Sequence, residues 1–173
     1  MTETLTHESS AFVNFRHFAF AERYAHAFRW LDVRRFRFSD PSAPDRDLLA
    51  GLVAHEQFRD DYAGGGVDPG GTRHGEYWLR LLTPEAYESI GRERAARLLA
   101  TWAEQYGPLP GPLAEALRRE AHDPLATADS VHHLNGLGED EYYDWASVHG
   151  EFHELVLVDR AARRLTLLVA ADD

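Results

Sequence analysis

Two apolar runs near the end of the chain constrain its fold more than any other feature of the sequence. Residues 152–159 and 165–170 are rich in leucine and valine, and the short, mostly polar segment 160–164 separates them. This pattern predicts a β-hairpin. Because an isolated two-stranded hairpin is only marginally stable in water, we expect it to pack on helices or to gain strands. Residues 33–38 and 76–82 are the candidates for added strands.

Helical patterns dominate the rest of the sequence. Apolar spacing, capping residues and terminating glycines predict several helices. These are residues 11–31, 45–61, 83–105 and 112–121, with short helical turns over residues 125–147. The aromatic positions between Phe18 and Trp30 also share the parity of a strand, so a strand stays open as an alternative there. Gly91 is a position at which the helix over residues 83–105 can bend or divide.

These elements predict one α+β domain. A length of 173 residues is close to the usual size of a single domain, and 44% hydrophobic residues are enough for an independent core. We expect residues 1–173 to form a single helix-rich domain with a small antiparallel sheet built on the C-terminal β-hairpin, and residues 1–10 to be frayed. The polar N-terminus and the lack of a long apolar run predict a cytoplasmic protein that does not bind membranes.

The chain contains neither lysine nor cysteine, and all 18 basic residues are arginine. The absence of lysine excludes a Schiff base, pyridoxal phosphate attachment and the lysine of a phosphate-binding loop. The absence of cysteine excludes a thiolate nucleophile, a zinc thiolate site and an iron-sulfur cluster. Any chemistry must therefore use histidine, carboxylates, hydroxyls and arginine.

The net charge of −11 argues against nucleic acid as a partner. The charge is concentrated, because residues 120–173 contain 12 acidic and 3 basic residues and so carry −9 of the total. Within this region an acidic and aromatic run combines charges that steer a basic partner with rings that anchor it. Its residues are Glu139, Asp140, Glu141, Tyr142, Tyr143, Asp144 and Trp145. We expect a binding or regulatory protein, such as an inhibitor or immunity-type module, that recognises a basic protein or a cationic small molecule.

A second hypothesis is a metal-dependent hydrolase or lyase acting on a small molecule. His149, Glu151 and His153 alternate along the chain, so an extended backbone places them on one face as three possible ligands of a divalent metal ion. The same three residues are the candidates for catalytic roles, with or without a metal. No spacing in the chain matches an established metal motif, so a polar edge strand is the competing interpretation.

Two further segments suggest a small-molecule pocket. Trp30, Tyr24 and Phe28 are candidates for an aromatic wall around a ligand. The glycine-rich segment 64–71 lacks the features of a phosphate loop and predicts a mobile loop or a lid that brings in Arg73 and His74. The oligomeric state, the substrate and the identity of the partner are left open by the sequence.

Overall fold

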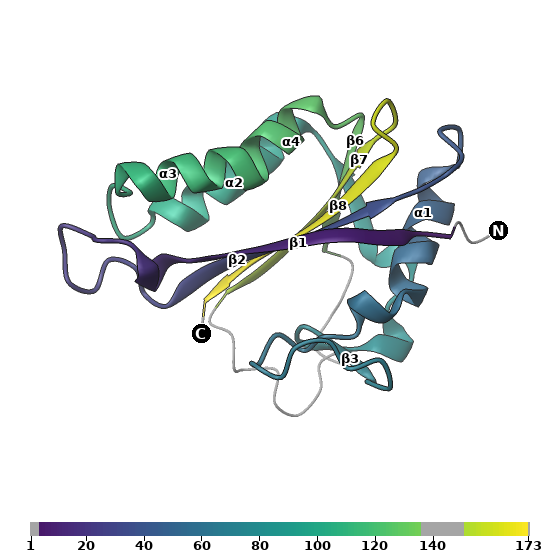
Figure 1. Ribbon diagram of the computed structural model, residues 1–173, viewed down its shortest axis with the longest axis horizontal. Coiled ribbons are helices and arrows are strands. Elements are labelled where there is room, and N and C mark those ends of the chain that lie inside the picture. The colour runs from purple at the N-terminus through teal and green to yellow at the C-terminus, as the bar shows by residue number, and fades with distance from the viewer. Residues whose placement is uncertain (1–3, 136–150, 173) are drawn as a thin grey trace.

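The computed structural model describes residues 4–135 and 151–172, and its central feature is a six-stranded sheet. The strands lie in the order β1-β2-β8-β7-β6-β5, with each neighbouring pair antiparallel (Figure 1). Their bounds are Thr6–Asn14 for β1, Arg29–Arg37 for β2, Tyr87–Ile90 for β5, Ser130–Leu134 for β6, Phe152–Asp159 for β7 and Arg164–Asp172 for β8. The short strands β3 (Arg73–His74) and β4 (Tyr77–Trp78) form a second sheet.

The two C-terminal strands occupy the centre of the six-stranded sheet. β8 pairs antiparallel with β7 on one side and with β2 on the other. Residues 154–158 and 165–172 are all buried, so both strands are covered on both faces. Strands in this position have continuous apolar sequences rather than alternating ones. This explains why these two runs are the clearest strand signal in the sequence.

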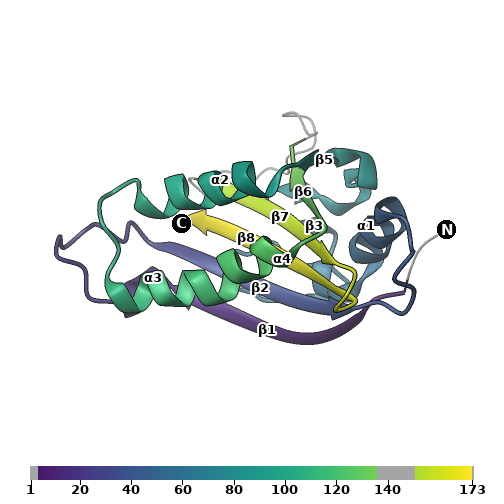
Figure 2. The same cartoon turned by 90° about the horizontal axis from the view of Figure 1, so that it is seen from above.

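Three helices cover one face of the sheet, which we call the helical face (Figure 2). They are α2 (Arg92–Glu104), α3 (Gly111–Leu117) and α4 (Asp123–Thr127). Their apolar side chains form a core with the sheet residues that point toward them, among them Leu155 of β7 and Leu168 of β8. The sequence favours this layer because α2 places apolar residues on one side only.

The opposite face, which we call the polar face, is covered by α1 (Asp45–Ala54) and by mostly irregular chain over residues 55–86. Leu48 and Leu52 of α1 are completely buried against it. It buries a group of charged side chains among its apolar ones, whereas on the helical face the completely buried Arg29 of β2 donates to backbone carbonyl oxygens of α2. Asp32 and Arg34 of β2 contribute two of these charges. The two faces of one sheet therefore offer different chemistry.

The N-terminal region differs from the prediction. Residues 11–31 do not form a helix; they comprise the end of β1, a 3-10 turn at Phe15–His17, a loop and the start of β2. Residues 6–10, expected to be frayed, belong to β1. The helical spacing misled because β2 is fixed by pairing with β8, which lies far along the chain, and such pairing overrides local preference. The alternative prediction of a strand between Phe18 and Trp30 is correct for Trp30, which lies in β2.

The predicted helix over residues 83–105 is divided at Gly91. Pro84–Ala86 form a 3-10 turn, β5 follows, and α2 begins directly after the glycine. The short strand forms because residues 87–90 pair with β6, a partner that local sequence does not reveal. β6 itself replaces part of the helical turns expected over residues 125–147. Residues 136–147 lie outside the described part of the chain.

The fold class is α+β, with helices on both faces of an antiparallel sheet. A helical majority is not confirmed, because helix and strand take similar shares of the described residues. The sheet is also larger than a hairpin with one or two added strands. Within residues 4–135 and 151–172, each helix is too short or too polar to cross a bilayer.

Candidate functional site

A row of charged residues crosses the otherwise apolar core of the polar face. Asp32 of β2 is opposite Val169 of β8, and Val169 is opposite Glu154 of β7. Opposed residues of an antiparallel sheet point to the same face, so both carboxylates lie on one row. Arg34, two residues after Asp32, points to the same face. Buried charges need partners, and the covering chain supplies them.

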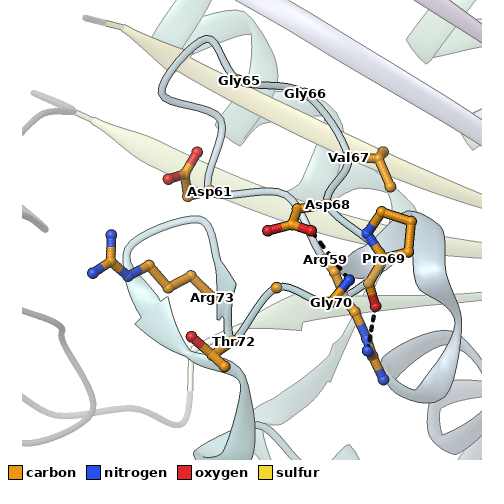
Figure 3. A pocket seen from close by; sticks show the side chains of 11 residues that line it. Arg59, Asp61, Gly65, Gly66, Val67, Asp68, Pro69, Gly70, Thr72 and Arg73 are labelled. Carbon is orange, nitrogen blue, oxygen red and sulfur yellow. Dashed lines mark hydrogen bonds between the residues drawn. The ribbon is translucent and has the colours of Figure 1, made fainter.

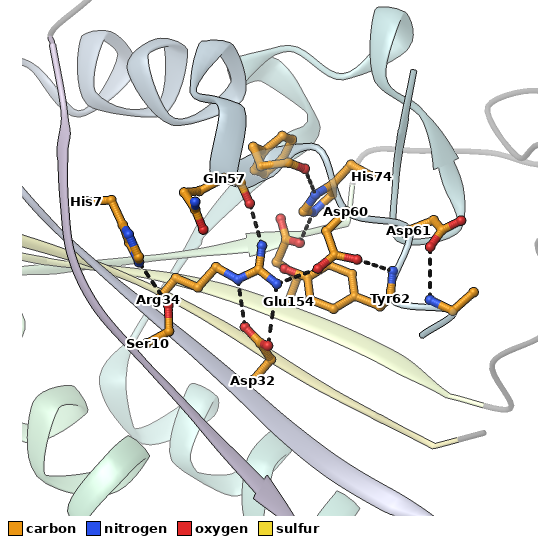
Figure 4. A network of polar contacts seen from close by, with 12 residues as sticks. His7, Ser10, Asp32, Arg34, Gln57, Asp60, Asp61, Tyr62, His74 and Glu154 are labelled. Carbon is orange, nitrogen blue, oxygen red and sulfur yellow. Dashed lines mark hydrogen bonds and ion pairs between the residues drawn. The ribbon is translucent and has the colours of Figure 1, made fainter. Parts of the chain in front are cut away.

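Arg34 connects the sheet to the covering chain (Figure 4). Its guanidinium donates hydrogen bonds to Asp32, to Asp60 and to the carbonyl oxygen of Gln57. Nε lies 3.0 Å from Asp32 Oδ1, and Nη2 lies 2.5 Å from Asp60 Oδ2. Burial lowers the pKa of Arg34, but the carboxylates of Asp32 and Asp60 raise it and hold it above its ordinary value. Arg34 is therefore a fixed cation on this face.

A tight turn places Asp60 and Tyr62 over the sheet. Asp60 Oδ1 accepts the backbone N–H of Tyr62 at 2.7 Å. This hydrogen bond supports a φ of 58° at Tyr62, a left-handed conformation that is uncommon for residues other than glycine. The backbone N–H of Gly75 donates to the carbonyl oxygen of Asp60 at 2.9 Å, which joins the turn to the β3–β4 hairpin. The turn thus delivers a carboxylate and an aromatic ring to the same place.

A second buried group joins β3, β5 and β7. The side chains of His74 and Glu154 are completely buried and in contact, and the hydroxyl of Tyr87 donates to the other oxygen of Glu154. His74 Nδ1 lies 2.6 Å from the carbonyl oxygen of Phe58, which only accepts, so Nδ1 carries a proton. The contact between His74 Nε2 and Glu154 requires a further proton between the two groups. The pair is therefore electrically neutral as a unit.

The charges of Asp32, Arg34 and Asp60 do not cancel. Arg34 supplies one positive charge for the two carboxylates of Asp32 and Asp60, so one negative charge is left over. Burial raises the pKa of Asp32, although Arg34 acts in the opposite direction. The side chain of Asp32 is 14% exposed and that of Asp60 only 5%. The uncompensated charge is therefore most accessible at Asp32.

A cavity of about 590 Å³ opens beside Asp32, with three aromatic residues in its walls. The rings of Trp30 and Tyr62 are stacked with centroids 5.7 Å apart, and the centroid of Phe12 lies 5.6 Å from that of Trp30. The strand register explains this arrangement, because Phe12 of β1 is directly opposite Asp32. A volume of this size is typical of small-molecule sites.

The hydroxyl of Tyr62 is buried and lacks a hydrogen-bond partner among the described residues. Burial raises the pKa of Tyr62 well above its ordinary value, so the hydroxyl stays protonated. Buried polar groups without partners are rare and energetically costly. A residue of the cavity wall thus has an unused donor and acceptor.

A second cavity of about 590 Å³ lies within the loop of residues 59–73 (Figure 3). Its polar groups are held by the loop itself, as when Arg59 donates to the carbonyl oxygen of Pro69. Its described lining includes no aromatic residue and no residue of the six-stranded sheet. Gly66 and Val67 line both cavities, so the loop forms a wall between them. The cavity beside Asp32 is the stronger candidate for a binding site.

Another polar group fixes α1 to the sheet. Asp45, the first residue of α1, accepts a hydrogen bond from His132 Nε2 at 2.8 Å and forms an ion pair with Arg160. The hydrogen bond from His132 is the main reason that the pKa of Asp45 lies at about 2, and Arg160 lowers it further. Since the carboxylate is compensated within the protein, this group has a sufficient structural explanation.

Two of the three predicted metal ligands lie in the described part of the chain. Glu151 Oε1 is 3.0 Å from His153 Nε2, and Gln105 donates to the other oxygen of Glu151 at 2.6 Å. His149 lies outside the described residues. Within residues 4–135 and 151–172, no three histidine, aspartate or glutamate side chains form a group able to hold a metal ion. A metal centre or a catalytic role for these residues stays a prediction.

The other predicted site residues have different outcomes. The acidic and aromatic run of residues 139–145 lies outside the described residues, so its recognition of a basic partner stays a prediction. Trp30, one candidate for an aromatic wall, lines the cavity on the polar face. Tyr24 and Phe28 instead lie exposed in the loop between β1 and β2. His74, expected to arrive with a lid, is part of the buried network.

The sequence analysis did not identify Asp32, Arg34, Asp60 and Tyr62. One signal was available, because Asp32 and Arg34 share the strand parity of the apolar Trp30 and so had to enter the core. The signal was missed because the expected helix over residues 11–31 placed Trp30 in a different element from Asp32 and Arg34.

Comparison with known proteins identifies no relative. No protein-family model matches this chain, and neither a curated protein nor a solved structure matches it. Its function must therefore be inferred from the geometry and chemistry of the polar face.

Proposed function

We propose that this protein binds a cationic small molecule in the cavity on the polar face. The observation that carries the proposal is the carboxylate of Asp32, which lines an aromatic cavity without full charge compensation. A buried charge is stabilised when an opposite charge reaches it. A ligand cation beside Asp32 would balance the polar face, whereas an anion would add a second uncompensated charge.

The aromatic walls favour the same class of ligand. Cations are attracted to the faces of aromatic rings, and Phe12, Trp30 and Tyr62 all line the cavity. Phe12 is 57% exposed and offers an apolar surface at the cavity. An organic amine with an apolar group fits these walls better than a bare metal ion. The net charge of −11 would also speed the approach of such a ligand.

The contacts of Arg34 indicate how the ligand binds. Arg34 Nε is 3.0 Å from Asp32 Oδ1, but Nη2 is 3.5 Å from Oδ2, which is long for a hydrogen bond. Oδ2 is thus the oxygen with more capacity to accept. A primary or secondary ammonium group can donate to it, while a quaternary ammonium group has no N–H to offer. We therefore propose a primary or secondary amine as the ligand.

Thermal unfolding with matched compounds tests this proposal. Each pair shares one skeleton, for example benzylamine with benzyl alcohol and cyclohexylmethylamine with cyclohexylmethanol. A ligand that binds only the folded state raises the unfolding temperature, so the amines should raise it and the alcohols should not. Asp32→Asn should abolish the response to amines. Glu93→Gln removes the same charge from an exposed position on α2 and should retain the response.

Three outcomes would contradict the proposal. These are equal responses to amines and alcohols, a response that persists in Asp32→Asn, and no response to any amine of the panel. A response lost equally in Asp32→Asn and Glu93→Gln would indicate attraction to the overall charge rather than binding at the cavity.

A further inference from the structure

The outer edge of the six-stranded sheet is open along β1. β1 is the first strand in the sheet order and pairs with β2 on its inner side. Within the described part of the chain, residues 6–14 form no backbone–backbone hydrogen bonds beyond that ladder. Figure 2 shows no described helix or strand outside β1. Such an edge presents N–H and C=O groups that are able to pair with another strand.

The two edges of this sheet are protected differently. β5, at the other edge, has four residues and contains Glu88, a charged side chain. β1 has nine residues, and its segment 9–14 contains no charge, proline or glycine. The register shift of β1 lies between His7 and Ser9, before this segment. Charges, prolines, bulges and short length are the devices that keep edge strands from pairing, and residues 9–14 have none of them.

We propose that β1 pairs antiparallel with β1 of a second copy of this chain. The charges near the two ends of β1 favour this arrangement, because Glu8 lies near its start and Arg16 lies two residues after its last residue, Asn14. With a two-fold axis at Phe12, antiparallel pairing places Glu8 of each copy near Arg16 of the other. A parallel arrangement would instead place like charges side by side. This inference does not depend on the proposed ligand.

The side chains of β1 fit such a pairing. Phe12 is 57% exposed, and the two-fold axis would place it against Phe12 of the second copy, a favourable aromatic pair across strands. Glu8 is held only loosely at present, 3.6 Å from Arg37 and 3.7 Å from Arg164. It is therefore able to turn toward a new partner. Because β5 is a short and charged edge, the assembly stops at two copies.

Sedimentation velocity of the full chain over a concentration series tests the proposal. We expect a monomer at low concentration and a dimer at high concentration, within about 5 to 200 µM, because a single strand pairing is a small interface. Phe12→Lys places two cations at the axis and should weaken the dimer at least about tenfold. Tyr24→Lys adds the same charge at an exposed residue of the β1–β2 loop and should leave it unchanged.

A charge exchange tests the antiparallel arrangement. Glu8→Arg alone and Arg16→Glu alone each place like charges together and should weaken the dimer. The double variant restores opposite charges across the axis and should recover it. Circular dichroism verifies that each variant is folded, and the exchange series suffices if Phe12→Lys does not fold.

A monomer throughout the concentration range would overturn the proposal. A dimer that is unaffected by Phe12→Lys would place the interface elsewhere and would overturn it too. Failure of the double variant to recover dimerisation would exclude antiparallel pairing centred on Phe12.

Discussion

The two faces of the central sheet are built from the same strands but stabilised by different interactions. On the helical face, α2, α3 and α4 pack on apolar residues such as Leu155 and Leu168. On the polar face, apolar packing is combined with the buried charges of Arg34, Asp60 and Glu154. Leu155 and Glu154 are adjacent in β7 and point to opposite faces, so one strand illustrates both types of core.

The difference suggests separate roles for the two faces: the helical face stabilises the protein, and the polar face offers a binding site. Apolar packing accounts for most of the helical face, and the completely buried Arg29 donates hydrogen bonds to backbone carbonyl oxygens, including that of Trp102 in α2. The polar face departs from that pattern by burying a network of opposite charges and leaving one of them uncompensated next to a cavity. Departures from the usual rules of folding concentrate at functional sites. The charged face is therefore where ligand binding is proposed.

Glu154→Ala should have the largest effect on stability. The variant leaves a cavity and removes the partner of the buried His74 and Tyr87, which should lower the free energy of unfolding by about 4 kcal/mol. Replacing both members of the pair, as in His74→Phe with Glu154→Leu, should recover at least half of that loss. Denaturant unfolding of the three proteins measures both values. A double variant less stable than Glu154→Ala would show that the ion pair is not the source of the effect.

Leu155→Ala tests the opposite face at the adjacent position. Leu155 is completely buried, so its truncation should lower the free energy of unfolding by about 3 kcal/mol. Because the cavity lies on the other face, the affinity of the folded variant for amines should not change. Equilibrium binding at a temperature where the variant is fully folded measures this. A large loss of affinity would mean that the two faces are not independent.

Acid should weaken the attachment of α1 on the polar face. The pKa of Asp45 is about 2 in the folded protein, below its ordinary value of 3.8, so the folded state favours the ionised form. The resulting stabilisation is present above about pH 4 and is lost as the pH falls through 2. After solvent screening we expect about 1 to 2 kcal/mol. Asp45→Asn should reduce this acid dependence in denaturant unfolding at several pH values, and an unchanged dependence would contradict the assignment.

Asp32→Asn should have the smallest effect on stability and the largest effect on binding. Burial raises the pKa of Asp32, so its ionised form is disfavoured in the folded state, and its contribution to stability falls as the pH rises. Near neutral pH the amide should therefore leave the free energy of unfolding unchanged or raise it by up to about 1 kcal/mol. A clear loss of stability would indicate that Asp32 has a structural role.

Part of this fold was accessible from the sequence. The central strands β7 and β8 have continuous apolar runs, and Asp45 marks the start of α1. β1, β5 and β6 were not predicted, because short strands are selected by partners elsewhere in the chain rather than by their own sequences. Pairing with β8 fixes β2, for example, although four α-helices lie between them in the described part of the chain.

The candidate site was less accessible than the fold. Its contacts join residues that are far apart in sequence, since Arg34 and Asp60 are 26 residues apart and His74 and Glu154 are 80 apart. Such contacts depend on the turn at Tyr62 and on the order of the strands, which local patterns do not specify. Trp30 was recognised as a candidate for the wall of a ligand pocket because a large aromatic side chain can be identified from the sequence without knowing its neighbours.

The most direct test follows the indole N–H resonances of Trp30 and Trp102 during titration with benzylamine. Trp30 lines the cavity on the polar face, whereas Trp102 is buried in the core of the helical face. We predict a saturable shift of the Trp30 resonance, no shift of the Trp102 resonance, and no effect of benzyl alcohol. Equal shifts of both resonances, an equal effect of the alcohol, or an unmoved Trp30 resonance would contradict binding of a cation at the polar face.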